Sequence, residues 1–374
     1  MCYSPTLIKN PNRGRHDSLA YLVDTNSQYI PVPCGHCGEC IALRSSAVHQ
    51  RVLLEELAGY PFFITLTYNN ESLAYYECSN GFKIPYSPIS DLQNMFKRLR
   101  KNESLTRRFR YYAITELGSK KGRPHAHILL FLERLAEDSV YTPINLEKIV
   151  WSEVLKEWRR NYGSTRNPDY RPLCTFIQRM KSGKLNSTFD CHYVFPSLSG
   201  TTQDVSYYVT KYLCKDSVFR DKLKKNLFGH LDFEEASEVW NKIKPRAISS
   251  LNFGFGIYDD INPRKTSKSE RLAVLSGLES AKLVRDSILR SSISEKTPKF
   301  FDVQTGKALP LARYWYKFGS LLPVDVYEKF VARQDRVDGV SIDDRSMTSK
   351  LLSEQKFVRN SVDSKQSNFD LLYD

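Results

Sequence analysis

The sequence has no apolar run approaching the roughly 18 residues that a membrane-spanning helix needs. Residues 1–5 lack the apolar core of a secretory signal. The chain also has no glycine-rich phosphate-binding loop of the kind found in helicases. These absences argue against a membrane protein, a secreted protein and a nucleotide-driven motor. We therefore expect a chain that acts inside a cell and has no membrane partner.

Cysteine is too sparse for a disulfide scaffold, with eight residues in a chain of 374. Three of them are clustered, at Cys34, Cys37 and Cys40, and supply three thiolates in a short glycine-containing loop. Three ligands are one short of a closed structural zinc site, and Cys2 or His36 is a candidate for the fourth. An iron–sulfur cluster would also need a fourth ligand, and three reduced cysteines remain the alternative. Zinc is favoured here because nothing else suggests redox chemistry.

Acidic residues are outnumbered, with 42 Asp and Glu against 55 Lys and Arg, a net charge of +13. A field of this sign favours polyanions, and nucleic acid first, although a basic enzyme of another kind has the same balance. Basic residues near the expected functional segments are candidate phosphate contacts: Arg98, Arg100, Lys101, Arg107, Arg108, Lys120, Lys121 and Arg123.

The hydrophobic patterns predict an α+β fold with a largely antiparallel central sheet flanked by helices. Strands are expected at 62–68, 110–116, 124–133, 175–177 and 192–195. Helices are expected at 39–57, from a cap at Asp91, at 145–162, 203–214, 217–227, 233–243 and 268–290.

Four regions follow from this order of elements. Residues 1–57 form an N-terminal segment with the cysteine cluster and a helix, and residues 58–216 form a catalytic domain. Residues 217–340 form a partly helical C-terminal region of unknown role. Residues 341–374 are rich in serine and charge, which is typical of a disordered tail.

A candidate metal site lies on the strand 124–133. His125 and His127 are two residues apart, so both imidazoles face the same side of a strand while Ala126 points into the core. If the preceding hairpin is centred between Lys120 and Lys121, Glu116 falls opposite His125. Two histidines and a carboxylate would then hold a divalent ion near the end of the sheet, exposed and contributing little to the core. The alternative is two polar residues near a strand end.

A candidate nucleophile lies in the helix expected over 203–214. Tyr208, Lys211, Tyr212 and Lys215 share one helical face, separate from an adjacent apolar face. A phenol has a pKa of about 10, and nearby ammonium groups favour its reactive phenolate form. Attack on a phosphate would give a phosphotyrosine ester that keeps the bond for later rejoining. The alternative is an amphipathic helix with packed aromatic rings and solvated lysines.

Together these segments resemble the HUH endonucleases, which include rolling-circle replication initiators and relaxases. Residues 63–68 look like the first strand of that family, residues 122–127 like its His-hydrophobe-His motif, and residues 208–212 like its two-tyrosine motif. The Gly-Arg-Pro-His-Ala-His and Tyr-Val-Thr-Lys-Tyr forms are most similar to the initiators of microviruses, particularly the gokushovirus branch, where the cysteine cluster also has a counterpart. Ala126 departs from the pattern, being smaller than the usual hydrophobe.

The resemblance implies an RRM-like palm, a catalytic Mg²⁺ or Mn²⁺, and viral origin DNA, single-stranded or supercoiled, as substrate. It further implies that Tyr208 or Tyr212 cuts the strand and keeps its 5′ phosphate, and that the second tyrosine acts after one round. A host polymerase and helicase in the cytoplasm of an infected bacterium would be the partners. Two alternatives stay open: a plasmid relaxase or mobilisation protein, and a zinc-containing DNA-binding protein without catalysis.

Overall fold

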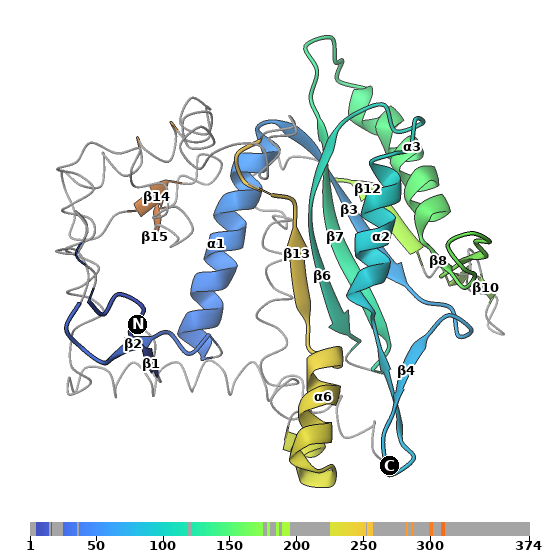
Figure 1. Ribbon diagram of the computed structural model, residues 1–374. Coiled ribbons are helices and arrows are strands. Elements are labelled where there is room, and N and C mark those ends of the chain that lie inside the picture. Colours follow the sequence, from blue (N-terminus) through green and yellow to red (C-terminus); the bar gives the residue numbers. More distant parts are fainter. Residues whose placement is uncertain are drawn as a thin grey trace.

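The structure is a computed structural model (Figure 1). It describes residues 5–14, 16, 25–35, 37–118, 122–174, 178–179, 185–186, 189–194, 225–251, 253–256, 282, 286, 299–301 and 308–310. The helix expected over 203–214, the strand expected over 175–177, Cys2 and His36 lie outside the described residues, as does most of the helix expected over 268–290.

A five-stranded antiparallel sheet forms the centre of the fold. Its strands lie in the order β12 (Phe189–Tyr193), β3 (Gly59–Thr67), β7 (Pro124–Glu133), β6 (Phe109–Leu117) and β13 (Arg246–Ser249). The middle strands are buried on both faces, as their continuous apolar runs predicted. The prediction of an α+β fold with an antiparallel sheet is confirmed. One edge strand, β13, comes from beyond residue 216.

Helices cover both faces of this sheet (Figure 1). On one face, α1 (Gly38–Glu56) packs Val48 and Val52 against Phe63 of β3 and Phe131 of β7. On the other face, α2 (Ile89–Leu99) and α3 (Thr142–Glu157) enclose the largest core cluster, with Leu92, Met95, Phe96, Leu99, Val150 and Val154 facing inward. We call these two sides the α1 face and the α2/α3 face. The helix predicted over 39–57 is confirmed.

The helix predicted over 145–162 ends earlier than expected, at Glu157. Trp158 leaves the helical conformation, is fully buried, and donates its Nε1–H to the Thr67 carbonyl oxygen at 3.0 Å. The chain then enters β8 (Arg159–Asn161), which pairs with β9 (Tyr170–Pro172). Tertiary packing of one indole ring therefore overrides the helical periodicity, and Ile149, expected inward, is 39% exposed.

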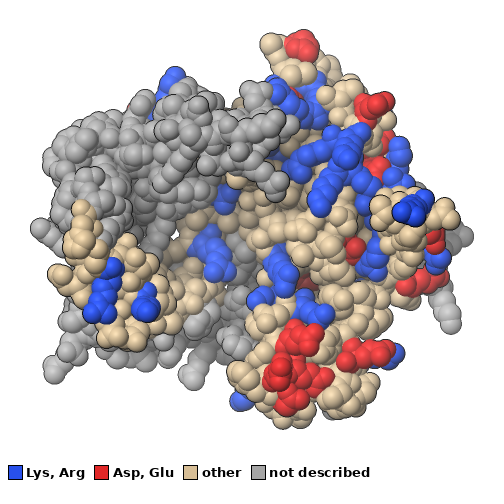
Figure 2. All heavy atoms as spheres, viewed as in Figure 1, with Lys and Arg blue, Asp and Glu red and all other residues tan. Residues whose placement is uncertain are grey.

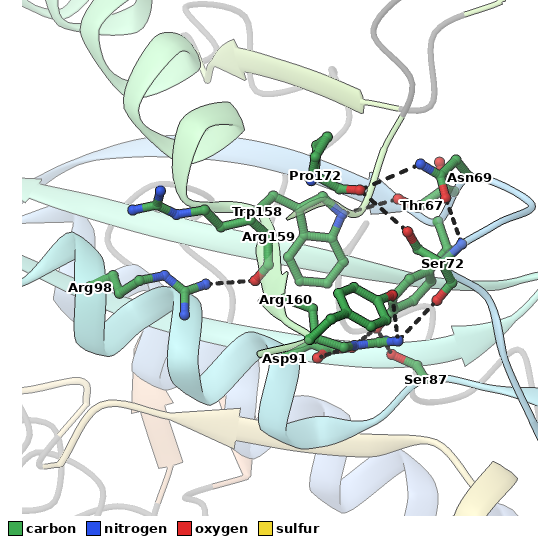
Figure 3. A network of polar contacts seen from close by, with 12 residues as sticks. Thr67, Asn69, Ser72, Ser87, Asp91, Arg98, Trp158, Arg159, Arg160 and Pro172 are labelled. Carbon is green, nitrogen blue, oxygen red and sulfur yellow. Dashed lines mark hydrogen bonds and ion pairs between the residues drawn. The ribbon is translucent and has the colours of Figure 1, made fainter. Parts of the chain in front are cut away.

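Asp91 does not cap α2, contrary to the prediction. The cap position is Pro88, and Asp91 lies in the first helical turn, where it is buried. Its carboxylate binds the Arg160 guanidinium at 2.6 Å and accepts a hydrogen bond from the Tyr68 hydroxyl at 3.1 Å (Figure 3). Asp91 thus joins α2 to the end of β3 and to β8.

Shorter elements surround this core. The described residues contain five two-stranded hairpins: β1 (Thr6–Lys9) with β2 (Tyr29–Val32), β4 (Ala74–Glu77) with β5 (Lys83–Tyr86), β8 with β9, β10 (Gln178–Arg179) with β11 (Leu185–Asn186), and β14 (Lys299–Phe301) with β15 (Ala308–Pro310). The predicted helix over 233–243 is confirmed as α6 (Phe233–Ile243). Within the described part of the chain, no helix has the length and apolar character needed to cross a bilayer.

A buried ion pair ties α1 to the sheet and to the segment after β13. Glu55 is fully buried, and its Oε1 lies 2.5 Å from Nε of Arg110 on β6. Its Oε2 accepts a hydrogen bond from the Gly254 N–H at 2.5 Å, while Arg110 donates to the Leu251 carbonyl oxygen at 2.8 Å. Gly254 has a φ of +99°, and a β-carbon there would lie 3.0 Å from Arg51 of α1. This close approach requires glycine.

We expect replacement of Glu55 by Ala to lower the free energy of unfolding by about 3–5 kcal/mol, because the Arg110 charge would stay buried without its counterion. The measurement is urea denaturation followed by circular dichroism. Glu77→Gln is the control, since it breaks a solvent-exposed pair with Lys83 and should change stability little. A Glu55→Ala protein as stable as the wild type would show that the pair is not a structural anchor.

Candidate functional site

Glu116, His125 and His127 come together at one end of the sheet, on the α1 face. The β6–β7 pairing sets Glu116 opposite His125, which is the register expected from the symmetric hairpin. Glu116 Oε1 lies 2.6 Å from Nε2 of His125 and 3.3 Å from Nε2 of His127. One ligand atom from each of the three residues lies within 4.8 Å of the others. We call this group the Glu-His-His cluster.

Hydrogen bonds fix the orientation of both imidazole rings. His125 Nδ1 lies 3.1 Å from the Arg123 carbonyl oxygen, and His127 Nδ1 lies 3.2 Å from the Thr65 hydroxyl oxygen on β3. A carbonyl oxygen only accepts, so Nδ1 of His125 carries the proton in this contact. Both Nε2 atoms then point at Glu116. Metal-binding histidines are commonly oriented in this way, by a hydrogen bond at the nitrogen that does not bind the ion.

The cluster is more buried than expected. The side chains of His127 and Glu116 are 6% and 8% exposed, and that of His125 is 15% exposed. The His127 ring stacks on Phe63, with centroids 5.5 Å apart and planes at 17°. The expectation that both histidines are exposed and contribute little to the core is therefore wrong for His127. The reason is that α1 covers this face of the sheet through Phe63.

The electrostatics of the cluster favour an ionised carboxylate. Burial alone would raise the pKa of Glu116, but hydrogen bonds and the charges of His125 and His127 outweigh burial and hold this pKa below its usual value. Two imidazoles and a carboxylate suit a divalent ion and leave positions open for other ligands. Mn²⁺ accepts imidazole nitrogen more readily than Mg²⁺, which prefers oxygen ligands.

A polar network on the α2/α3 face holds the strand end next to this cluster (Figure 3). Thr67, the partner of His125 in the β3–β7 pairing, accepts the Trp158 hydrogen bond. Arg123, two residues before His125, donates to the Tyr68 carbonyl oxygen and, at 2.8 Å, to Asn70 Oδ1. Sequence reasoning missed these supporting residues, because their partners lie far away along the chain and no local spacing connects them.

Basic residues gather over α2 and α3, and acidic residues gather over α6 (Figure 2). Several of the expected phosphate contacts already have protein partners: Arg98 binds Glu157 at 3.0 Å, Arg108 binds Glu133 at 2.6 Å, and Arg107 binds Asp138. Arg100 lies over the Phe109 and Tyr111 rings. Lys101 is exposed, whereas Lys120 and Lys121 lie outside the described residues. The surface available to phosphate is thus narrower than the charge count suggests.

The remaining expected site residues fall into two groups. Cys34, Cys37 and Cys40 lie together at the start of α1, with their sulfur atoms within 4.8 Å of one another. The expected nucleophiles and their neighbouring lysines, Tyr208, Lys211, Tyr212 and Lys215, lie outside the described residues, so their relation to the Glu-His-His cluster stays a prediction.

Comparison with known proteins places similarity in the region that contains these residues. Residues 61–217 match a family model of replication-associated proteins, the ORF2 family. A stretch of 146 residues is 30% identical to the replication-associated protein ORF2 of Spiroplasma virus 4, covering 35% of this chain and 44% of that protein. The match thus spans less than half of the viral protein's length. No solved structure matches significantly.

We expect Glu116→Gln to weaken Mn²⁺ binding by at least about tenfold, because it keeps the side-chain shape but removes the charge that an ion needs. His125→Ala should do the same with little loss of stability. His127→Ala should additionally lower the free energy of unfolding, by roughly 2–4 kcal/mol, through the lost contact with Phe63. Calorimetric Mn²⁺ titration beside urea denaturation measures both effects. Wild-type Mn²⁺ affinity in Glu116→Gln would contradict a metal role for this cluster.

Proposed function

We propose that this chain initiates viral DNA replication by nicking a single strand at an origin through a tyrosine nucleophile. The observation that carries the proposal is the convergence of Glu116, His125 and His127 inside the region that matches replication-associated proteins. That region, residues 61–217, also contains Tyr208 and Tyr212. The net charge of +13 supports a polyanionic substrate.

Glu116, His125 and His127 are the residues that would hold a Mg²⁺ or Mn²⁺ ion. Such an ion, when bound, polarises a phosphoryl group and neutralises charge that develops on it. The fit rests on the donor set, two imidazoles with their Nε2 atoms turned toward one carboxylate. Thr65 and the Arg123 carbonyl group orient the imidazoles, and the polar network around Trp158 and Arg160 holds the strand ends that carry them.

The chemical step is a transesterification by a phenol. The oxygen of Tyr208 or Tyr212 attacks the phosphorus atom, its bond to phosphorus forms, and the bond to the 3′ oxygen breaks. Lys211 and Lys215, on the same helical face in the predicted helix, favour the phenolate. The products are a 5′-phosphotyrosine link and a free 3′ hydroxyl group, which a host polymerase can extend. Attack by a later 3′ hydroxyl on the phosphotyrosine rejoins the strand, so no bond energy is lost.

Two alternative functions would use the same surface differently. A plasmid relaxase would carry out the same chemistry, and the match to replication-associated proteins favours an initiator over it. A DNA-binding protein without catalysis would bind the strand but form no covalent link. The buried, oriented Glu-His-His cluster argues for chemistry, since binding alone needs no such arrangement.

The deciding experiment incubates the protein with single-stranded origin DNA labelled at its 3′ end and Mn²⁺. The 3′ fragment carries the 5′ phosphate produced by cleavage, so a covalent adduct appears as a shifted band on a denaturing gel. We expect this band with Mn²⁺, and none with EDTA or with Glu116→Gln. DNA binding without any adduct at saturating Mn²⁺ would favour the non-catalytic alternative. An adduct formed equally in EDTA would rule out the metal-assisted route.

We expect Tyr208→Phe and Tyr212→Phe each to keep partial activity and the double variant to have none. One helical turn would separate the two phenols by about 5–6 Å, so either one can reach the same phosphate. Phenylalanine keeps the ring and removes only the nucleophilic oxygen. Each single variant should form one adduct but fail to close a circle.

Tyr207→Phe is the matched control, because residue 207 lies on a different helical face and should retain full activity. Adduct formation and circle closure on an origin oligonucleotide measure the two steps separately. If the double variant still forms the adduct, another of the 22 tyrosines is the nucleophile.

A further inference from the structure

We propose that Cys34, Cys37 and Cys40 bind a single zinc ion that anchors the N-terminus of α1. The three sulfur atoms lie within 4.8 Å of one another, although the residues are spread along the loop and the first helical turn. Cys34 Sγ and Cys40 Sγ are 3.9 Å apart. This distance is nearly twice the length of a disulfide bond, about 2.05 Å, so the two thiols are close but not joined.

The sulfur spacing fits one tetrahedral ion. With zinc–sulfur bonds of about 2.3 Å, two thiolates on the same ion lie about 3.8 Å apart. Cys34 and Cys40 already have this separation. In an iron–sulfur cluster the cysteines bind different iron atoms, which moves their sulfur atoms farther apart than two ligands of one ion. The geometry therefore favours a mononuclear site over a cluster, which sequence spacing alone left open.

The backbone around the cysteines is arranged to bring them together. Gly35 has a φ of +78°, a left-handed conformation that suits glycine, and turns the chain directly after Cys34. The Cys37 N–H donates a hydrogen bond to Cys34 Sγ at 3.3 Å, as backbone amides do to metal-bound thiolates. Cys37 is the N-cap of α1 and Cys40 lies in its first turn. The positive end of the helix dipole stabilises thiolates at these positions.

The position of the site indicates what zinc would do. Further along α1, Val48 and Val52 pack on Phe63, the residue whose ring stacks on His127. The C-terminal turn of α1 carries Glu55, which holds Arg110 and Gly254. A zinc ion would fix the other end of the same helix. It would thus be a structural ion, distinct from the ion proposed at the Glu-His-His cluster, because a thiolate site suits zinc and an imidazole–carboxylate site suits Mn²⁺.

The test measures metal content and coordination in the full-length protein, expressed with zinc in the medium. We expect about one zinc per chain by elemental analysis and, after exchange, the intense sulfur-to-cobalt charge-transfer absorption of tetrahedral Co²⁺ thiolates. Cys37→Ser and Cys40→Ser should each lose most of the zinc. Cys174→Ser is the matched control: this cysteine is as buried as Cys40, packs on the α2/α3 face, and its variant should keep the zinc.

A second measurement on the wild type avoids the risk that the serine variants fail to fold. Titration with a thiol-modifying mercurial should release zinc to a colorimetric chelator, while Mn²⁺-dependent nicking is followed separately. Folded wild-type protein that holds no stoichiometric zinc and gives no cobalt–thiolate band would overturn the proposal. Iron with acid-labile sulfide would also overturn it. Neither result would bear on the proposed nicking activity, which is measured with added Mn²⁺.

Discussion

The pairing of β6 with β7 is the constraint on which the candidate site depends. Side chains alternate between the faces of a strand, so a slip of one residue would send Glu116 to the α2/α3 face while His125 stayed on the α1 face. The register is fixed by burial on both faces of the sheet, because Ile128 and Leu130 fill one core cluster and Leu129 and Phe131 fill the other. The core therefore sets the geometry of the polar cluster, and the histidines need not stabilise it.

Helix α1 transmits this constraint to distant parts of the chain. Its middle covers Phe63 and thereby the His127 ring, and its end places a buried carboxylate between Arg110 of β6 and the Gly254 amide. A buried charge without a partner is costly, so Glu55 and Arg110 hold their helix and strand in one relative position. The segment that follows β13 is drawn into the same contact. Residues about 200 positions apart along the chain thus support one face of the sheet.

The sequence predicted those features that depend on local pattern. Strands β6 and β7, helix α1 and the opposition of Glu116 and His125 followed from apolar runs and from the symmetry of one hairpin loop. Features set by distant contacts were not predictable. Burial of Trp158 against β3 ended α3 early, Asp91 paired with Arg160 instead of capping a helix, and β13 joined the sheet from beyond the expected domain. The tyrosine helix stays a prediction from residue spacing.

The topology limits where a tyrosine nucleophile can approach. The Glu-His-His cluster lies on the α1 face, and the opposite side of the same strands is filled by α2, α3 and Trp158. A phosphate bound at the cluster is therefore reachable only from the α1 face or past the strand ends. Before residues 195–224, Tyr193 pairs with Phe62, at the end of β3 away from the cluster. After them, Leu227 packs in the cluster that includes Leu117, next to the hairpin that carries Glu116 and His125. The chain between these points must pass from one end of the sheet to the other, and Tyr208 and Tyr212 lie near the middle of that passage.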